Sequence, residues 1–237
     1  MPKYFFSEDK NQKKDGFIFP NEAVERHLIR VLRASLGDVF IFCDGRKTDY
    51  ICRISGLKPF CLEILEKKPC KNEAPIKIIL YTGITKQNLM EFIAQKGTEL
   101  GMTSLRPIIT RYTNEKINIE RLQKKALSGA EQSMRGIIPE IRESAPLSDA
   151  MKNADGFSVV LHEKNINSSI RLTEILKNIN IKTRLNIWVG PPGGFSENEI
   201  ELFKEKNYLI TRMGNLILRT ETAALCALSV IYNNLCI

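Results

Sequence analysis

The chain has 237 residues, 43% of them hydrophobic, and its 35 Lys and Arg against 27 Asp and Glu give a net charge of +8 and a pI near 9.2. This length exceeds one average domain and the apolar content is ample for a core, so two globular domains are expected. No apolar run of about 18 residues occurs, and the N-terminus lacks the apolar stretch of a signal peptide, which favours a cytoplasmic protein without a transmembrane segment.

The positive charge is spread along the chain. Residues 1–70 carry 13 Lys and Arg against 10 Asp and Glu (+3), and residues 71–237 carry 22 against 17 (+5). Such a spread favours a broad field for an anionic partner such as nucleic acid, although a merely lysine-rich composition gives the same numbers. The six cysteines include no C-x-x-C pair and are accompanied by only two histidines, so reduced thiols and no metal site are expected.

Residues 1–70 are predicted to be mostly β-structure. Short β-prone runs, separated by glycine-containing turns, cover 17–19, 38–43, 50–54 and 61–65. A helix is predicted over 21–33 with Asn21 as N-cap. Its apolar stripe consists of Val24, Leu28, Val31 and Leu32. Arg26, Arg30 and Arg33 project elsewhere, either toward RNA phosphates or simply into solvent.

A polar stretch bracketed by prolines, residues 67–75, predicts the boundary between one domain over 1–70 and a second over 71–237. Strands and helices then alternate, which predicts an α/β domain with a mainly parallel sheet. Strands are expected near 76–83, 104–110, 157–162, 185–190 and 208–213, and helices near 87–100, 118–135, 169–179, 197–206 and 220–235. The strands are apolar enough to be covered on both faces, and the last helix is apolar nearly all round, typical of a core or a subunit interface.

Two glycine-containing turns stand out in the second half. The first, 189–196, follows an apolar run and ends in Ser196, which forms an S-x-x-E capping box with Glu199. The second, 213–218, precedes the last helix. Glycine allows the backbone to approach a ligand, and such crevices lie beyond the carboxyl ends of parallel strands. A rigid connection without a ligand is the alternative. Neither turn is a P-loop or a G-x-G-x-x-G fingerprint.

The two turns carry a family resemblance. GPPGGFSENEIE (190–201) and MGNLILRTETA (213–223) resemble the signature of the bacterial 16S rRNA (uracil-N3)-methyltransferase family, in the SPOUT superfamily. Further matching blocks occur in the expected order: HLIRVLR (27–33), MEFIAQKGTELGM (90–102), PIITRYT (107–113) and AEQSMRGIIPEI (130–141). One departure is visible, because the family usually has Glu where this chain has Pro192.

The resemblance implies an N-terminal PUA-like β-barrel that helps to hold RNA, and a SPOUT domain with a C-terminal trefoil knot, usually as a homodimer. It also implies S-adenosylmethionine as cofactor, held by three loops, with ribosomal RNA or the small ribosomal subunit as partner. The implied cofactor-binding residues are Leu161, Glu163, Gly190, Pro191, Gly193, Gly194, Met213, Gly214, Ile217 and Leu218.

Transfer of a methyl group to N3 of uracil requires positioning and loss of the N3 proton, and a cation stabilises charge on the uracil carbonyl oxygens. Arg219 is the expected cation. Glu221 is either the proton acceptor or a carboxylate favoured at a helix N-terminus. Arg111 and Arg135 match family motifs and are expected to contact RNA. Two alternatives stay open: a SPOUT enzyme with another RNA target, and a non-catalytic RNA-binding protein, which Pro192 keeps in consideration.

Overall fold

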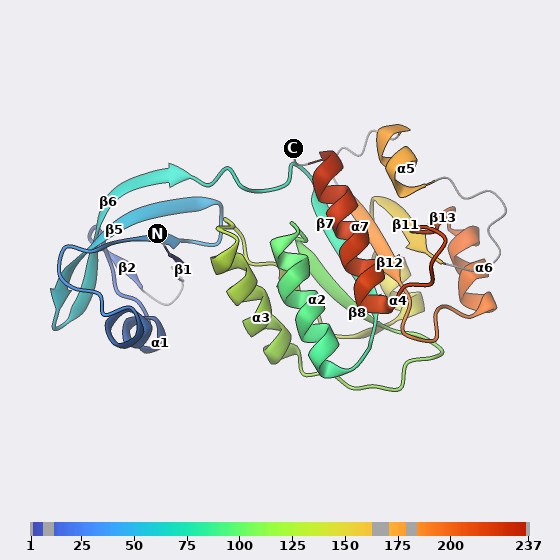
Figure 1. The fold of residues 1–237 in the computed structure, drawn as a ribbon, viewed down its shortest axis with the longest axis horizontal. Coiled ribbons are helices and arrows are strands. Elements are labelled where there is room, and N and C mark those ends of the chain that lie inside the picture. The colour runs from blue at the N-terminus through green and yellow to red at the C-terminus, as the bar shows by residue number, and fades with distance from the viewer. Residues whose placement is uncertain (1, 7–11, 163–170, 179–183, 236–237) are drawn as a thin grey trace. The chain divides into compact units, whose positions relative to one another are not determined.

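The computed structural model describes residues 2–6, 12–162, 171–178 and 184–235 (Figure 1). The chain divides into two compact units. The N-terminal unit comprises residues 1–73 together with 130–138, and the C-terminal unit comprises 74–129 and 139–237. The division therefore falls three residues after the expected one, and a short segment expected in the second domain belongs to the first. None of the helices in the described ranges is both long and apolar enough to cross a membrane.

The N-terminal unit is built on a six-stranded sheet in the order β1-β4-β5-β6-β3-β2. Its strands are β1 (Lys3–Phe5), β2 (Lys13–Lys14), β3 (Phe17–Ile18), β4 (Val39–Cys43), β5 (Thr48–Leu57) and β6 (Phe60–Pro69). The four predicted strands are present, and β1 and β2 are additional. Inward-facing side chains such as Ile18, Phe42 and Leu62 are fully buried and make the core of this unit. The alternation of buried and exposed residues along β4 and β5 is that of a sheet with one covered face.

The helix predicted over 21–33 is only partly as expected. Asn21 is the N-cap, since its Oδ1 accepts the backbone N–H groups of Ala23 and Val24 at 3.0 Å each. The α-helix α1 (Glu22–Arg26) then passes into a π-helical turn, η2 (His27–Val31). The i→i+5 bonding of a π-turn takes the following residues off the 3.6-residue period. The four apolar residues therefore do not share one buried face: Leu28 is buried, whereas Val31 and Leu32 are exposed.

The C-terminal unit contains a seven-stranded, all-parallel sheet in the order β10-β8-β7-β12-β11-β13, with β9 also paired to β8. Its strands are β7 (Lys77–Gly83), β8 (Ser104–Ile109), β9 (Glu140–Ile141), β10 (Ala145–Pro146), β11 (Phe157–Leu161), β12 (Arg184–Val189) and β13 (Leu209–Thr211). Its helices are α2 (Gln87–Glu99), α3 (Ile119–Gln132), α4 (Leu147–Lys152), α5 (Leu172–Asn178), α6 (Glu197–Glu205) and α7 (Thr220–Leu235). The last three residues of α3 belong to the N-terminal unit.

Helices cover both faces of this sheet. Buried side chains from α2, α3, α5 and α7 form one core cluster with the strands, and side chains from α4 and α6 form a second cluster. The central strands β7 and β12 lie between these layers (Figure 1) and are buried along nearly their whole length. The predicted parallel α/β architecture is thus confirmed. The trefoil knot concerns the threading of the chain and stays a prediction.

Candidate functional site

A cavity of about 780 Å³ opens beyond the carboxyl ends of the parallel strands. Segments that follow five different strands contribute to its wall: 84–86 after β7, 112–115 after β8, 161–162 after β11, 189–195 around the end of β12, and 212–221 after β13. The strand order reverses at the centre of the sheet, because β8 lies on one side of β7 and β12, β11 and β13 on the other. This is the topological switch point at which open α/β sheets bind ligands.

The first glycine turn is packed backbone against backbone. A Cβ on Gly190 would lie 2.9 Å from the carbonyl carbon of Gly194, and a Cβ on Gly83 would collide with the backbone nitrogen of Pro191. Gly194 has a φ of 73° and donates its N–H to the Pro191 carbonyl at 2.8 Å. A side chain at Gly83 or Gly190 meets backbone, and Gly194 occupies the left-handed region that favours glycine. The turn thus requires glycine for its own shape, at the wall of the cavity.

The second turn is tied to the first at the start of α7. The Thr220 hydroxyl, which is buried, donates to the Gly190 carbonyl at 3.0 Å. The Ala223 N–H donates to the Arg219 carbonyl at 2.8 Å, so Arg219 occupies the N-cap position of α7. The Thr220 hydroxyl therefore joins the two turns and does not cap its own helix. The Arg219 side chain consequently leaves the chain where α7 meets the cavity.

Most residues expected to hold the cofactor are brought together at this cavity. Those that line it are Leu161, Gly190, Pro191, Gly193, Gly194, Met213, Gly214, Ile217 and Leu218. Glu163 lies outside the described residues. Arg219 and Glu221, expected in the chemistry, also line it, as does Pro192. Ile217 lines the cavity but is itself 81% exposed, so it offers little enclosed apolar surface to a ligand.

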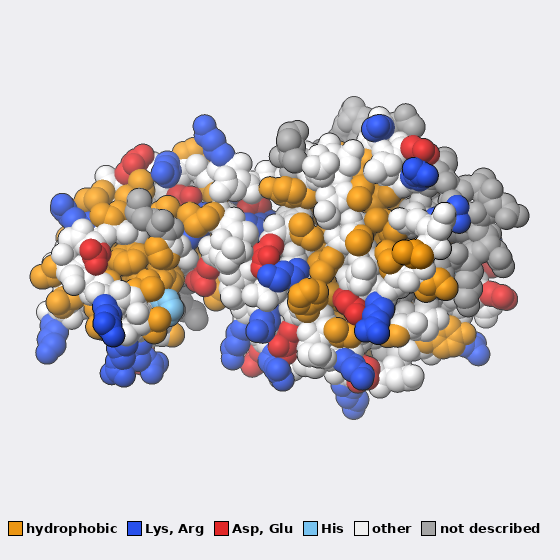
Figure 2. All heavy atoms as spheres, viewed as in Figure 1, with side chains coloured by type: hydrophobic (Ala, Val, Ile, Leu, Met, Phe, Trp, Pro, Cys, Tyr) orange, Lys and Arg blue, Asp and Glu red, His pale blue; other side chains and the backbone are white. Residues whose placement is uncertain are grey.

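The arginines expected to contact RNA lie in different environments, since some are exposed and Arg135 is buried. Arg26, Arg30 and Arg33 are exposed on and just after α1 and η2, and Figure 2 shows Lys and Arg side chains gathered at this part of the N-terminal unit. Arg26 makes a loose exposed pair with the Glu22 carboxylate at 3.9 Å and donates from Nε to the Glu22 carbonyl at 3.2 Å. Arg111 is exposed after β8 but does not line the cavity.

Arg135 is not at the surface, where the sequence placed it. Its guanidinium and the carboxylate of Glu73 are 2.7 Å apart, with only 3% and 4% of their side chains exposed. Glu73 also accepts the backbone N–H groups of Gly136 and Ile137 at 2.8 and 3.1 Å. The physical reason is local: α3 ends at Gln132, and Met134, with a φ of 58°, turns the chain inward instead of extending the helix.

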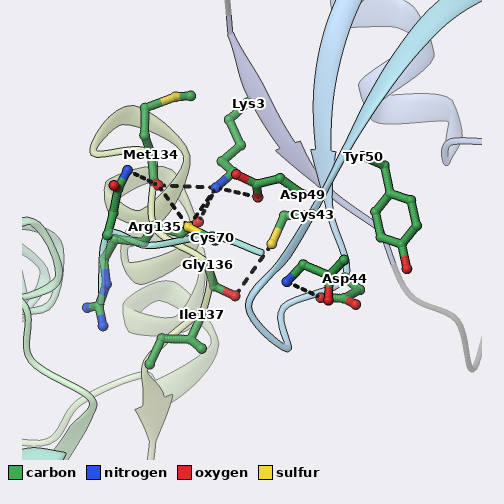
Figure 3. A network of polar contacts seen from close by, with 12 residues as sticks. Lys3, Cys43, Asp44, Asp49, Tyr50, Cys70, Met134, Arg135, Gly136 and Ile137 are labelled. Carbon is green, nitrogen blue, oxygen red and sulfur yellow. Dashed lines mark hydrogen bonds and ion pairs between the residues drawn. The ribbon is translucent and has the colours of Figure 1, made fainter. Parts of the chain in front are cut away.

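The turn after α3 is held from a second side within the N-terminal unit. Figure 3 shows the Lys3 amino group among the carbonyls of Met134 and Arg135, at 3.1 and 2.8 Å, and the carboxylate of Asp49, at 2.7 Å. The Lys3 side chain is 1% exposed, so these partners replace its hydration. Arg135 and its neighbours therefore build the N-terminal unit, and the guanidinium has no exposed face for RNA.

Several cavity residues were not predicted from the sequence. They are Ile84, Thr85, Lys86, Tyr112, Asn114, Glu115 and Arg212, with Gly83 behind them. All of these lie near the carboxyl end of a predicted strand or in the segment that follows it. That position was the available signal, because every parallel strand delivers the residues after it to the same edge of the sheet.

Two family models match the chain. An RNA methyltransferase domain matches residues 72–232, and an RNA methyltransferase PUA domain matches residues 23–65. Among curated proteins, the chain is 30% identical to ribosomal RNA small subunit methyltransferase E of Bacillus subtilis, over 98% of this chain and 96% of that one. It is 32% identical to the protein of the same name from Rickettsia conorii, over 84% of this chain and 82% of that one.

Two solved structures resemble the whole chain. One is ribosomal RNA small subunit methyltransferase E from Neisseria gonorrhoeae bound to S-adenosylmethionine, with a TM-score of 0.82, 26% identity and coverage of 98% and 97% of the two chains. The other is a putative methyltransferase from Legionella pneumophila in complex with the same cofactor, with a TM-score of 0.83, 26% identity and coverage of 97% and 96%.

Proposed function

We propose that this chain, which belongs to the family of ribosomal RNA small subunit methyltransferase E, methylates N3 of a specific uridine in 16S ribosomal RNA with S-adenosylmethionine as donor. The observation that carries the proposal is the meeting of two glycine-containing turns, residues 189–196 and 213–218, at a single cavity beyond the parallel strands. The N-terminal unit, which the PUA family model overlaps, supplies a second, RNA-holding surface.

The cavity suits S-adenosylmethionine by size and by its lining. Its volume of about 780 Å³ lies in the usual range of ligand pockets, roughly 300–1,000 Å³. Gly190 to Gly194 and Met213 to Leu218 present backbone donors and acceptors, with Leu161 and Leu218 as apolar wall, for the adenosine and methionine parts. When bound, the sulfonium of the cofactor supplies an electrophilic methyl group. The chain's own residues hold it and exclude water.

Arg219 stabilises the negative charge that develops on the uracil carbonyl oxygens as N3 loses its proton. It carries the permanent positive charge of a guanidinium and is anchored at the N-cap of α7 by the bond between its carbonyl and Ala223. Glu221, two residues on and also at the cavity, accepts the N3 proton. Alternatively, Glu221 is only a carboxylate favoured by the dipole of α7. In that case, replacing Glu221 leaves the pH dependence of methyl transfer unchanged.

The substrate is ribosomal RNA, either free or within the small ribosomal subunit. Arg26, Arg30 and Arg33 of the N-terminal unit contact its phosphates, and the net charge of +8 draws the two together. We further assign a cytoplasmic location, where ribosomal RNA is found, a homodimeric state with α7 near the partner subunit, and the knotted threading of the C-terminal segment.

Calorimetric titration with S-adenosylmethionine tests the pocket. The wild type is expected to bind, Gly194→Val to lose binding because a branched side chain cannot adopt a φ of 73°, and Arg219→Ala to bind normally while its single-turnover rate falls about 100-fold or more. Glu201→Gln, on the exposed face of α6, is the matched control. A folded wild type that binds no S-adenosylmethionine, with or without RNA, contradicts the methyltransferase function and leaves an RNA-binding protein.

A further inference from the structure

The residues directly after β8 form a closed turn. The Thr113 N–H donates to the Thr110 carbonyl at 3.1 Å, and the Thr113 hydroxyl accepts the Thr110 N–H at 3.0 Å. The two hydroxyls also lie 3.1 Å apart. This bonding leaves Arg111 and Tyr112 at the tip of the turn. The tip is defined in shape, but its own bonds do not fix where it lies against the glycine turn 190–196.

Glu199 fixes that position. It is buried, and its Oε2 accepts the Ser196 N–H at 2.8 Å, as the predicted capping box requires. The same oxygen also accepts the Ser196 hydroxyl at 2.9 Å. Its other oxygen, Oε1, accepts the Arg111 N–H at 2.9 Å, from a residue 88 positions earlier. One carboxylate thus joins the start of α6 to the turn after β8. A helix cap alone needs only the first of these two connections.

Tyr112 is held against the glycine turn by this connection. A Cβ on Gly193 would lie 2.9 Å from the Tyr112 Cβ and 3.1 Å from its Cγ, so the tyrosine occupies the space that a side chain at Gly193 would need. Gly193 and Pro192 are exposed, whereas Gly190 and Pro191 are buried. Tyr112 therefore contacts the outer, solvent-facing part of the turn, at the rim of the cavity.

An exposed aromatic ring at this rim is a stacking surface. Tyr112 is 45% exposed, while Phe195, the other aromatic residue of the described cavity wall, is 5% exposed. Single-stranded RNA is commonly held by stacking its unpaired bases on aromatic side chains, and an enzyme that acts on a base must take it out of the stack. A base entering the cavity from solvent meets the rim first.

We infer that Tyr112 stacks on the target uracil and that Glu199 is the positioning residue that holds it there through Arg111 N–H. This inference rests on the proposed methyl transfer to uridine. The adenine of the cofactor is the other base that this ring could receive. The rim position favours the uracil, because the cofactor is assigned to the turns themselves, including the buried Gly190.

Kinetics with the intact protein and its RNA show whether Tyr112 stacks on the target uracil or on the adenine of the cofactor. Tyr112→Ala is expected to lower kcat/KM for 16S ribosomal RNA about 10- to 100-fold, the usual effect of removing one stacking ring, and to leave the Kd for S-adenosylmethionine within about twofold. Tyr112→Phe, which keeps the ring, restores wild-type kcat/KM. An equal loss of cofactor affinity in Tyr112→Ala assigns the ring to adenine and overturns the inference. Unchanged kcat/KM overturns it as well.

A double-mutant cycle tests the positioning role. Glu199→Gln retains one acceptor oxygen, so it cannot serve both Ser196 and Arg111, and kcat/KM for RNA is expected to fall about 10-fold. In the Tyr112→Ala background the same change is expected to have less than a twofold further effect, because the group it positions is gone. Additive losses in kcat/KM instead mean that Glu199 acts independently of Tyr112, and they overturn the positioning role. Glu201→Gln on the same helix controls for charge, and thermal unfolding confirms that each variant is folded.

Methyl transfer by the wild type distinguishes failure of this inference from failure of the proposed function. If the folded wild type transfers no methyl group to any small-subunit RNA, the proposed function fails and the inference fails with it. If the wild type is active and Tyr112→Ala matches it in both constants, the function stands and only the inference fails.

Discussion

At the scale of single residues, Arg135 shows how a signature arginine can be structural. It lies in one of the blocks that carry the family resemblance, and a basic residue at a helix end invites an RNA role. In the structure it makes a buried pair with Glu73, whose carboxylate also holds two backbone N–H groups. Such a pair contributes little against an apolar replacement of both partners, but loss of one partner leaves an uncompensated buried charge.

Arg135→Ala is therefore expected to lower the free energy of unfolding by about 3–5 kcal/mol, measured by urea denaturation. Arg142→Ala is the matched control. Its ion pair with Glu140 has the same 2.7 Å separation, but both side chains are more than half exposed, so the expected loss is below about 1 kcal/mol. Equal losses in the two variants, or a loss in RNA affinity without a loss in stability for Arg135→Ala, contradict this account.

Burial also decides the reactivity of the cysteines. Desolvation raises the pKa of the Cys43 and Cys52 thiols to about 12, so both stay protonated near pH 8. Alkylation by iodoacetamide at that pH, followed by mass spectrometry, is expected to modify the exposed Cys226 first and these two only after unfolding. Because the raised pKa favours the neutral thiol in the folded state, this contribution to stability is complete below about pH 8.5 and is lost as the pH rises toward 12. Rapid labelling of Cys43 in folded protein is inconsistent with this assignment.

At the scale of secondary-structure elements, the pocket depends on where the elements begin and end. The start of α7 and the end of β12 are joined by the bond from the Thr220 hydroxyl to the Gly190 carbonyl, so the two glycine-containing turns are held together at one wall of the cavity. A bond of this kind, buried and between elements 30 residues apart, contributes about 1 kcal/mol to the arrangement it fixes.

Thr220→Val keeps the shape of the side chain and removes the donor. It is expected to raise the Kd for S-adenosylmethionine about 3- to 10-fold and to lower stability by about 1 kcal/mol, because the Gly190 carbonyl loses its partner. Thr222→Val, an exposed position in the same turn of α7, serves as control in the same calorimetric titration. Identical Kd values for the two variants show that this bond does not organise the pocket.

The sequence allowed the second half of the chain to be predicted closely, because each apolar strand and amphipathic helix there is marked by its own period and bounded by glycine, proline or a capping box. α6, for example, begins at Glu197 after Ser196, as the capping box predicted. The π-turn η2 was not predictable, since its apolar residues fit a 3.6-residue period as well. For the same reason the two glycine turns could be singled out. The contact of Tyr112 with Gly193 and the bond from the Arg111 N–H to Glu199 could not, because each joins residues 80 or more positions apart.

At the scale of the whole molecule, the N-terminal unit is discontinuous. Residues 1–73 are completed by 130–138, so the chain passes between the units after residues 73, 129 and 138. Residues 130–138 are an integral part of this unit. Arg135 pairs with the buried Glu73, and its carbonyl accepts a hydrogen bond from the buried Lys3, which also pairs with Asp49. A fragment that stops at residue 73 leaves Glu73 without Arg135, and Lys3 without the carbonyls of Met134 and Arg135.

The exposed arginines of the N-terminal unit give a measurable property of the whole protein, the salt dependence of RNA binding. Simultaneous replacement of Arg26, Arg30 and Arg33 by Gln is expected to weaken binding to small-subunit RNA at 0.1 M salt. It is also expected to reduce the slope of log K against log salt by about 2, since each phosphate contact releases about 0.7 counterion from single strands. Lys204→Gln on α6 is the control. An unchanged slope removes these arginines from the RNA surface.

The most direct test of the proposed function is an assay of methyl transfer. Purified protein is incubated with S-adenosylmethionine carrying a labelled methyl group and with small ribosomal subunits that lack their modifications, and the 16S ribosomal RNA is then digested to nucleosides for mass spectrometry. One labelled 3-methyluridine per RNA is expected, formed by the wild type and not by Arg219→Ala. Label in another nucleoside, or cofactor binding without any transfer to ribosomal RNA, contradicts the proposed methyl transfer to uridine N3.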